Sequence, residues 1–204
     1  MAKTKYTKNE LKKQKDQLKR FNRYLPTLVL KKQLLQMEIR NVELQINEKS
    51  KQRERINTEL MSWIHVFGEN LNIAGLAKVK EADLETANIA GIDIPVFNGV
   101  IYEDISYDLM LYPLWVDAGV QKLKELYSAD MELTILKKQS ELLGEELRIT
   151  TQRVNLFEKV KIPEAEEAIR RIKIFIGDQM TNAVGRGKIA KKKIEESLRE
   201  EAFS

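Results

Sequence analysis

Apolar side chains recur at heptad spacing along the N-terminal third of the chain, and thirteen of the eighteen seam positions between residues 7 and 67 are apolar. A 3.5-residue period held over this length predicts one coiled-coil helix of roughly 60 residues, on the order of 90 Å long. The seam positions are Thr7, Gln14, Phe21, Leu28, Leu35, Val42, Lys49, Ile56 and Trp63, and Leu11, Leu18, Leu25, Lys32, Ile39, Ile46, Arg53, Leu60 and Phe67.

A second heptad run begins near residue 133 and predicts the partner helix, which we expect to start between Tyr112 and Trp115 because Pro113 suits a first turn. Pro26 and Pro163 lie inside the two patterns; at Pro26 we predict a bend and no helix end. The second seam comprises Leu133, Leu136, Ser140, Leu143, Leu147, Thr150, Val154, Phe157, Lys161, Glu164 and Ala168, continued by Ile172, Phe175, Ala183, Ala190 and Ile194.

The segment between the runs loses the helical period and gains glycine. Residues 92–97 and 100–102 favour strands, and Asn98-Gly99 between them predicts the turn of a β-hairpin. The two seams can be buried together only if the chain folds back. The predicted fold is therefore mainly α: an antiparallel two-helix left-handed coiled coil of residues 1–67 and 112–204, with a β-hairpin and loop insert, 68–111, at the end opposite the termini.

The composition is typical of an ordered helical protein. The additional information it gives is the uneven distribution of charge along the chain. Residues 1–60 carry 16 Lys and Arg against 7 Asp and Glu, whereas residues 61–130 carry 4 against 11. Antiparallel folding would therefore give one basic and one acidic pole. The chain contains no Cys, which excludes disulfides and thiolate metal sites. With no apolar leader or membrane-spanning run, we expect a cytoplasmic protein.

Candidate catalytic and ligand-binding groups are sparse, and each has a simpler interpretation. His65 is the single histidine and lies beside the seam, which favours packing or solvation. Residues 185–188, Gly-Arg-Gly-Lys, lack the preceding strand and the spacing of a phosphate-binding loop. Glu164, Glu166 and Glu167 have no metal-ligating partners nearby, so a solvated helix face explains them. We expect no enzyme, cofactor or metal.

Charged residues suggest partner surfaces. The basic stretches at 12–15 and 191–193 have the charge that binds nucleic acid, but they are interleaved with seam residues and lack aromatic stacking partners, so we favour a protein partner. Lys32, Lys49, Arg53 and Lys161 occupy seam positions. Long aliphatic stems that reach water explain them equally well, although Lys49 and Arg53, one turn apart, could form a polar layer that binds another protein chain.

Residues 151–158, Thr-Gln-Arg-Val-Asn-Leu-Phe-Glu, followed by Ile162-Pro-Glu-Ala-Glu166, resemble the signature of the D subunits of the V-type and A-type rotary ATPases. The N-terminal segments 6–11 and 28–35 are similar to the start of that family. In that family, the D subunit is the central rotor axle and does not hydrolyse ATP. Its paired termini lie inside the ring of catalytic and regulatory subunits, and its other end meets the small F subunit and the adaptor subunit of the membrane ring.

The resemblance implies a stalk protein, peripheral to the membrane through its complex, that binds those partners and neither nucleic acid nor the membrane itself. Together with the charge pattern it predicts three partner-binding groups. They are the head-facing residues Lys12, Lys13, Lys19, Arg186, Lys188, Lys191 and Lys192, the residues Lys49, Arg53, Leu143 and Leu147 for docking the small stalk protein, and the ring-side cap residues Ile94, Phe97 and Tyr102. A prefoldin-like chaperone and a cytoskeletal or tethering coiled-coil scaffold are the alternatives.

Overall fold

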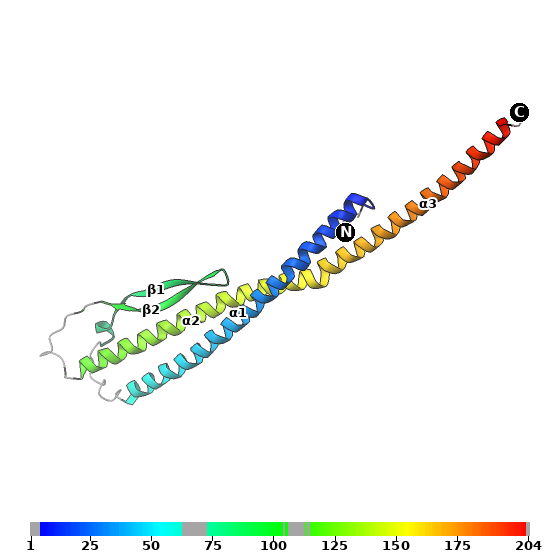
Figure 1. The fold of residues 1–204 in the computed structure, drawn as a ribbon. Helices are drawn as coiled ribbons and strands as arrows, with labels where there is room; N and C mark the ends of the chain where they lie inside the picture. Colours follow the sequence, from blue (N-terminus) through cyan, green and yellow to red (C-terminus); the bar gives the residue numbers. More distant parts are fainter. Residues whose placement is uncertain (1–4, 63–72, 104, 106–112, 114, 203–204) are drawn as a thin grey trace. The chain divides into compact units, whose positions relative to one another are not determined.

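The computed structural model describes residues 5–62, 73–103, 105, 113 and 115–202. In chain order, one long helix precedes an antiparallel hairpin and further long helices follow it (Figure 1). The predicted mainly α fold with an inserted hairpin is confirmed, whereas Trp63, His65 and Phe67 lie outside the described residues. The elements are α1 (Lys8–Ser62), the 3-10 helix η2 (Ile73–Leu76), β1 (Val79–Ile89), β2 (Ile92–Tyr102), α2 (Val116–Leu156), the π-helical turn η3 (Phe157–Lys161) and α3 (Ile162–Ala202).

The chain divides into two compact units, one formed by its two terminal segments and the other by the continuous segment between them. Unit 1 comprises Met1–Leu30 and Thr151–Ser204, and unit 2 comprises Lys31–Thr150. Both chain termini therefore belong to unit 1, and the hairpin belongs to unit 2. This division cuts across the three predicted segments, 1–67, 68–111 and 112–204, which stay a prediction.

Helix α1 follows the predicted heptad closely. Thr7 caps its first turn, because the Thr7 hydroxyl accepts a hydrogen bond from the backbone N–H of Glu10 at 3.2 Å. Every predicted seam side chain from Leu11 to Leu60 is buried or half-buried, and most other side chains of α1 are exposed. The helix continues through Pro26, whose exposed position leaves water to satisfy the freed carbonyl. The bend at Pro26 stays a prediction, as does the handedness of the coiled coil.

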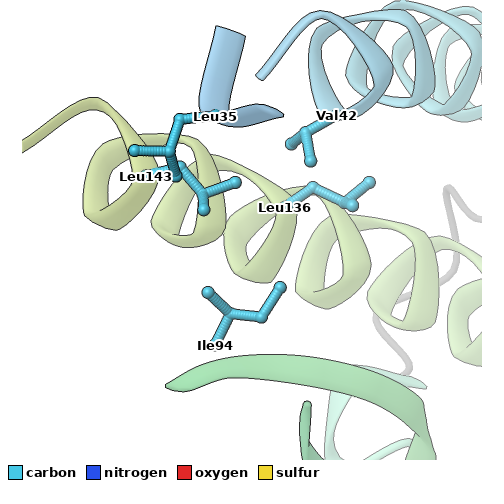
Figure 2. Packing of buried hydrophobic residues seen from close by; sticks show 5 residues of the cluster. All are labelled: Leu35, Val42, Ile94, Leu136 and Leu143. Atoms are coloured by element: carbon cyan, nitrogen blue, oxygen red, sulfur yellow. The ribbon is translucent and has the colours of Figure 1, made fainter. Parts of the chain in front are cut away.

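The core of unit 2 is a three-part sandwich centred on α2. Leu35 and Val42 of α1 and Ile94 of β2 pack with Leu136 and Leu143 of α2 in one cluster. Figure 2 shows the α2 residues between α1 on one side and the hairpin on the other. Leu35 and Leu143 are both 0% exposed. Because these large side chains are fully covered, this cluster supplies much of the hydrophobic stabilisation of the unit.

A smaller apolar cluster fixes the start of α2. Ala77, Val116 and Val120 are buried there, and Trp115 packs against them. Helix α2 begins at Val116, just after the predicted start, and the Val116 N–H donates to the carbonyl of Pro113 at 3.0 Å. Pro113 thus precedes the helix and does not lie in its first turn.

The hairpin turn is not where the sequence pattern placed it. Residues 92–102 form one continuous strand, and the turn is Ala90-Gly91, where both φ angles are positive at 55° and 80°. Asn98 instead lies at a register irregularity, since Asp83 pairs with Gly99 and Leu84 with Phe97. Two successive positive φ angles give the twist of a two-residue hairpin loop, so the Asn98-Gly99 prediction was wrong. Asn98 provides the extra residue of a bulge.

The strained Ala90 gives a direct test of this turn. We expect Ala90→Asn to raise the free energy of unfolding by about 0.5–1 kcal/mol, because Asn tolerates positive φ better than Ala. Gly99→Ala, at a position with normal φ and open space around it, should change stability by less than about 0.5 kcal/mol. Urea unfolding measures both, and a turn at Asn98-Gly99 would require the larger effect at Gly99.

Unit 1 contains the π-helical turn that displaces the second seam. The N–H of Ile162 donates to the carbonyl of Phe157, five residues earlier, which widens the helix immediately before Pro163. A widened turn places one additional residue before the next seam position. As a result Ala165, Ile169 and Ile172 are buried and Glu164 is exposed. The prediction of Glu164 as a seam residue was therefore wrong by one position.

Candidate partner-binding surfaces

Ion pairs join α1 to α2 along unit 2. Lys31, Lys49 and Arg53 pair with Glu146, Glu132 and Asp130 at 2.7, 2.8 and 2.8 Å, and Glu59 pairs with Lys122 at 3.3 Å. Residues later in α1 pair with residues earlier in α2, so the two helices are antiparallel. Each pair is partly exposed and contributes modestly to stability. Their joint effect is to fix the register of the two helices, as flanking charges do in coiled coils.

The predicted polar layer at Lys49 and Arg53 is thus occupied by acidic residues of the same chain. The hydrogen bond to Asp130, reinforced by its charge, raises the pKa of Arg53. Both basic side chains keep about two-fifths of their surface exposed, so a partner could still contact them. Their role in docking the small stalk protein stays a prediction.

The other two residues of that predicted docking group lie in the interior of unit 2. Leu143 is fully buried between α1 and the hairpin, and Leu147 is half-buried against the same cluster. A covered side chain affects a partner only through the helix that it holds in place. We therefore expect Leu143 to act on stability, and its docking role stays a prediction.

The hairpin lies along α2 and is held by both apolar and polar contacts (Figure 1). Ile94 is buried, Phe97 is half-buried, and the Tyr102 hydroxyl donates to the carbonyl of Lys124. Burial raises the pKa of the Tyr102 phenol. The buried Gln139 side chain donates to the carbonyl of Pro95 in β2. Ile94 and Tyr102 thus face their own chain, and a ring-side role for all three predicted cap residues stays a prediction.

The predicted head-facing residues form two separate groups within unit 1. Lys12, Lys13 and Lys19 are exposed on α1. The α3 group, Arg186 to Lys192, begins eleven residues beyond Phe175, whose ring packs on Tyr6 at 5.2 Å between centroids near the start of α1. At about 1.5 Å per residue, that is roughly 16 Å further along α3. The structure does not bring the two groups together.

The distal part of α3 carries an apolar stripe that no other described segment covers. Every side chain from residue 177 to 198 is exposed, including Met180, Ala183, Ile194 and Leu198, which share one helix face. The predicted seam residues Ala183, Ala190 and Ile194 follow this stripe. Lys191 lies at its edge, and Lys191 and Lys192 make only weak ion pairs within their own helix, both at 3.7 Å. This surface is suited to a protein partner that supplies apolar contacts.

A groove of about 700 Å³ in unit 1 lies between α1 and α3. Its charged lining residues are already paired: Lys161 with Glu164 at 3.4 Å and Arg171 with Glu167 at 2.7 Å. Phe21 lines the same groove and packs on Phe157 at 5.3 Å between ring centroids. The described lining of this groove is therefore made mainly of aromatic, polar and ion-paired side chains.

Glu167 accepts hydrogen bonds from both Arg170 and Arg171, which lower its pKa from about 4.5 to about 2. Because the folded pKa lies below the unfolded one, the stabilising effect is present above pH 4.5 and is lost as the pH falls toward 2. Carbon NMR of the Glu167 carboxyl should report this low pKa. Replacing both Arg170 and Arg171 with Gln should return it to about 4.5, and an unchanged pKa would show that the arginines are not its cause.

The described part of the chain offers little that could hold a ligand. Within it, no group of three or more His, Asp or Glu residues is placed to bind a metal ion. None of the described helices is both long and apolar enough to cross a bilayer. Paired helices, exposed apolar and charged faces and an inserted hairpin define a class of protein that acts through extended helical surfaces.

Comparison with known proteins identifies the family. The family model for the D subunit of ATP synthase matches residues 10–192. The V-type ATP synthase D subunit of Borreliella burgdorferi is 51% identical over 191 residues, covering 94% of this chain and 95% of the relative. The corresponding proteins of Chlamydia pneumoniae and Chlamydia caviae are 36% and 34% identical, and each alignment covers over nine-tenths of both chains. The chain belongs to the family of ATP synthase D subunits, which confirms the resemblance.

Several residues that shape these surfaces were not predicted from the sequence. Asp130 and Glu132 could have been found by aligning the two heptad runs antiparallel, since both then fall opposite basic residues of α1. Gln139 gave no such signal, because a Gln inside a heptad run looks like any solvated position. Its partner is the carbonyl of Pro95, a backbone atom that no pairing of side-chain patterns reveals.

Proposed function

We propose that this chain is the central stalk of a V-type ATP synthase complex and works as a shaft, carrying torque between the nucleotide-binding head and the membrane ring. Membership of the family of ATP synthase D subunits is the observation that carries the proposal. The antiparallel register of α1 and α2, fixed by ion pairs and a buried core, supports it. A shaft must resist twisting, because elastic deformation would dissipate torque before it reached the ring.

We propose further that the chain has no catalytic role of its own. Its work is mechanical: closing of the surrounding head subunits on bound nucleotide pushes against an asymmetric helical surface. The exposed apolar stripe of α3 and its neighbouring lysines are suited to sliding contact within the head. The remaining partners in this proposal are the small F subunit of the stalk and the adaptor subunit of the membrane ring. The complex would hold the chain on the cytoplasmic side, peripheral to the membrane.

The prefoldin-like chaperone and the tethering scaffold have no support from the family membership, and one experiment separates all three. Tagged protein is recovered from its native cell together with the membrane fraction, and the eluate is analysed by mass spectrometry and for ATP hydrolysis. We expect the large head subunits, a small stalk protein and ATPase activity. Recovery of unfolded client proteins, or of the chain alone, would contradict the proposal.

A further inference from the structure

A second apolar stripe runs along α1 within unit 2, on the side away from the seam. Leu34, Met37 and Leu44 are 41%, 52% and 63% exposed, although all three are large and apolar. At about 100° per residue they fall in one sector of the helix; Met37 and Leu44 lie roughly opposite the buried Leu35 and Val42, and Leu34 lies about 100° from Leu35. Single exposed apolar residues are ordinary on protein surfaces. Three of them at heptad spacing form the pattern by which one helix packs on another.

Basic side chains share this sector. Arg40, Lys51 and Arg55 are exposed and make no ion pair within the described part of the chain, in contrast to Lys31, which is bound to Glu146. Two acidic side chains, Glu48 and Glu59, lie in or beside this sector, and Glu59 is paired with Lys122 at 3.3 Å, so the sector keeps a net positive charge. An uncompensated basic border beside an apolar stripe is complementary to an acidic border beside another stripe.

We propose that this α1 outer stripe, Leu34, Met37 and Leu44 with the basic border of Arg40, Lys51 and Arg55, binds a helix of another protein whose apolar heptad is flanked by Asp and Glu. A second copy of this chain does not fit, because pairing two stripes would bring two basic borders together. Asn41 occupies the heptad position between Met37 and Leu44. A polar side chain there gives the partner helix one preferred register.

The outer stripe extends the proposed function, since a stalk protein needs a static partner as well as a sliding one. It is a different surface from the predicted docking residues Lys49, Arg53, Leu143 and Leu147. Those residues contact acidic groups or the core of their own chain, whereas the outer stripe is unoccupied by the described residues.

The full-length protein can be tested alone with two synthetic amphipathic peptides of four heptads. Both carry Leu at the seam positions, and they differ only in whether Glu or Lys flanks that seam. Fluorescence anisotropy should show the Glu peptide binding at least about tenfold more tightly. The triple variant Arg40→Glu, Lys51→Glu, Arg55→Glu should reverse this preference, and Leu34→Gln with Met37→Gln and Leu44→Gln should abolish binding.

A matched charge reversal at Lys80, Lys137 and Lys138, which are exposed in the same unit but off the outer stripe, should leave the preference for the Glu peptide intact. If neither peptide binds, or if the preference survives the reversal at Arg40, Lys51 and Arg55, the proposal is overturned.

The accessibility of the outer stripe can also be measured in the assembled complex. Because the chain has no native cysteine, a maleimide can react within it only at an introduced cysteine. Met37→Cys and the control Glu43→Cys, which is exposed on another face of α1, are each labelled with a maleimide before and after assembly. Labelling of Met37→Cys should slow at least about tenfold in the complex, and that of Glu43→Cys should not.

The labelling and peptide results distinguish a failure of the proposed function from a failure of the outer stripe. Failure of both Cys variants, and of the unmodified protein, to join an ATPase complex would contradict the proposed function, and the peptide measurements would still decide the outer stripe. Assembly with unprotected Met37→Cys would overturn the outer stripe alone. A crosslink from Met37→Cys must reach a helix with an acid-flanked heptad; a crosslink to a second copy of this chain would also overturn it.

Discussion

Replacing Leu143 with Ala is expected to lower the free energy of unfolding by about 3 kcal/mol. The side chain is fully buried between α1 and the hairpin, so its loss removes hydrophobic contacts and leaves a cavity. Urea unfolding followed by circular dichroism measures the change. The matched control is Leu44→Ala on the exposed face of α1, which should cost less than about 1 kcal/mol. Equal losses at the two positions would contradict the packing described for unit 2.

Removing residues 178–204 is expected to leave the rest of the chain folded but to abolish its use in the complex. Residues 177–198 are all exposed, so the melting temperature of the remaining chain should hardly change. Loss of several contact residues at an interface typically reduces the binding free energy by over about 2 kcal/mol, which corresponds to more than a tenfold loss of affinity. ATP-driven ion transport by complexes reconstituted with the truncated chain should therefore fall at least about tenfold.

A full-length variant separates charge from apolar contact in this prediction. This variant replaces the head-facing basic residues with Gln, which preserves the helices but removes the positive charges. The replaced residues are Lys12, Lys13, Lys19, Arg186, Lys188, Lys191 and Lys192. We expect partial loss of coupling, measured as ions transported per ATP hydrolysed. If this variant and the truncated chain both assembled and coupled normally, the head-facing role of the terminal segments would be excluded.

The sequence predicted the long-range features well because they rest on periodicity. The seam of α1 from Leu11 to Leu60, the continuation through Pro26 and the fold class all follow from one repeated pattern of apolar residues. A helix buries whichever face is apolar, so the pattern and the burial coincide. The resemblance to the D subunits rests on residues 151–166. In this segment Pro163 follows directly after the π-helical turn at Phe157–Lys161.

Local backbone geometry was predicted less well, for two physical reasons. Asn98-Gly99 is a strong turn pair, but register in a hairpin is also set by which residues face the core, and burial of Ile94 against α2 placed the turn at Ala90-Gly91. The π-helical turn at Phe157–Lys161 arises because Pro163 cannot donate a hydrogen bond. Heptad counting assumes a constant number of residues per turn, so it could not anticipate the shift from Glu164 to Ala165.

Partner surfaces were the hardest to predict, because sequence patterns do not show which side chains the chain itself will use. Lys49 and Arg53 have no partner that the heptad pattern reveals, because Glu132 and Asp130 lie far away in the sequence. Conversely, Leu34, Met37 and Leu44 form a second apolar row, which the sequence pattern alone does not distinguish from a buried one. Only the folded unit distinguishes an apolar row that is covered from one that is left exposed.

The proposed function requires this chain to rotate inside its complex, and rotation can be observed directly. A Glu85→Cys variant, exposed on β1, carries a bead while the head subunits are fixed to a surface. With ATP present, we expect unidirectional rotation of the bead that stops when ATP is removed. ATP hydrolysis at a normal rate with the bead stationary in intact complexes would contradict the claim.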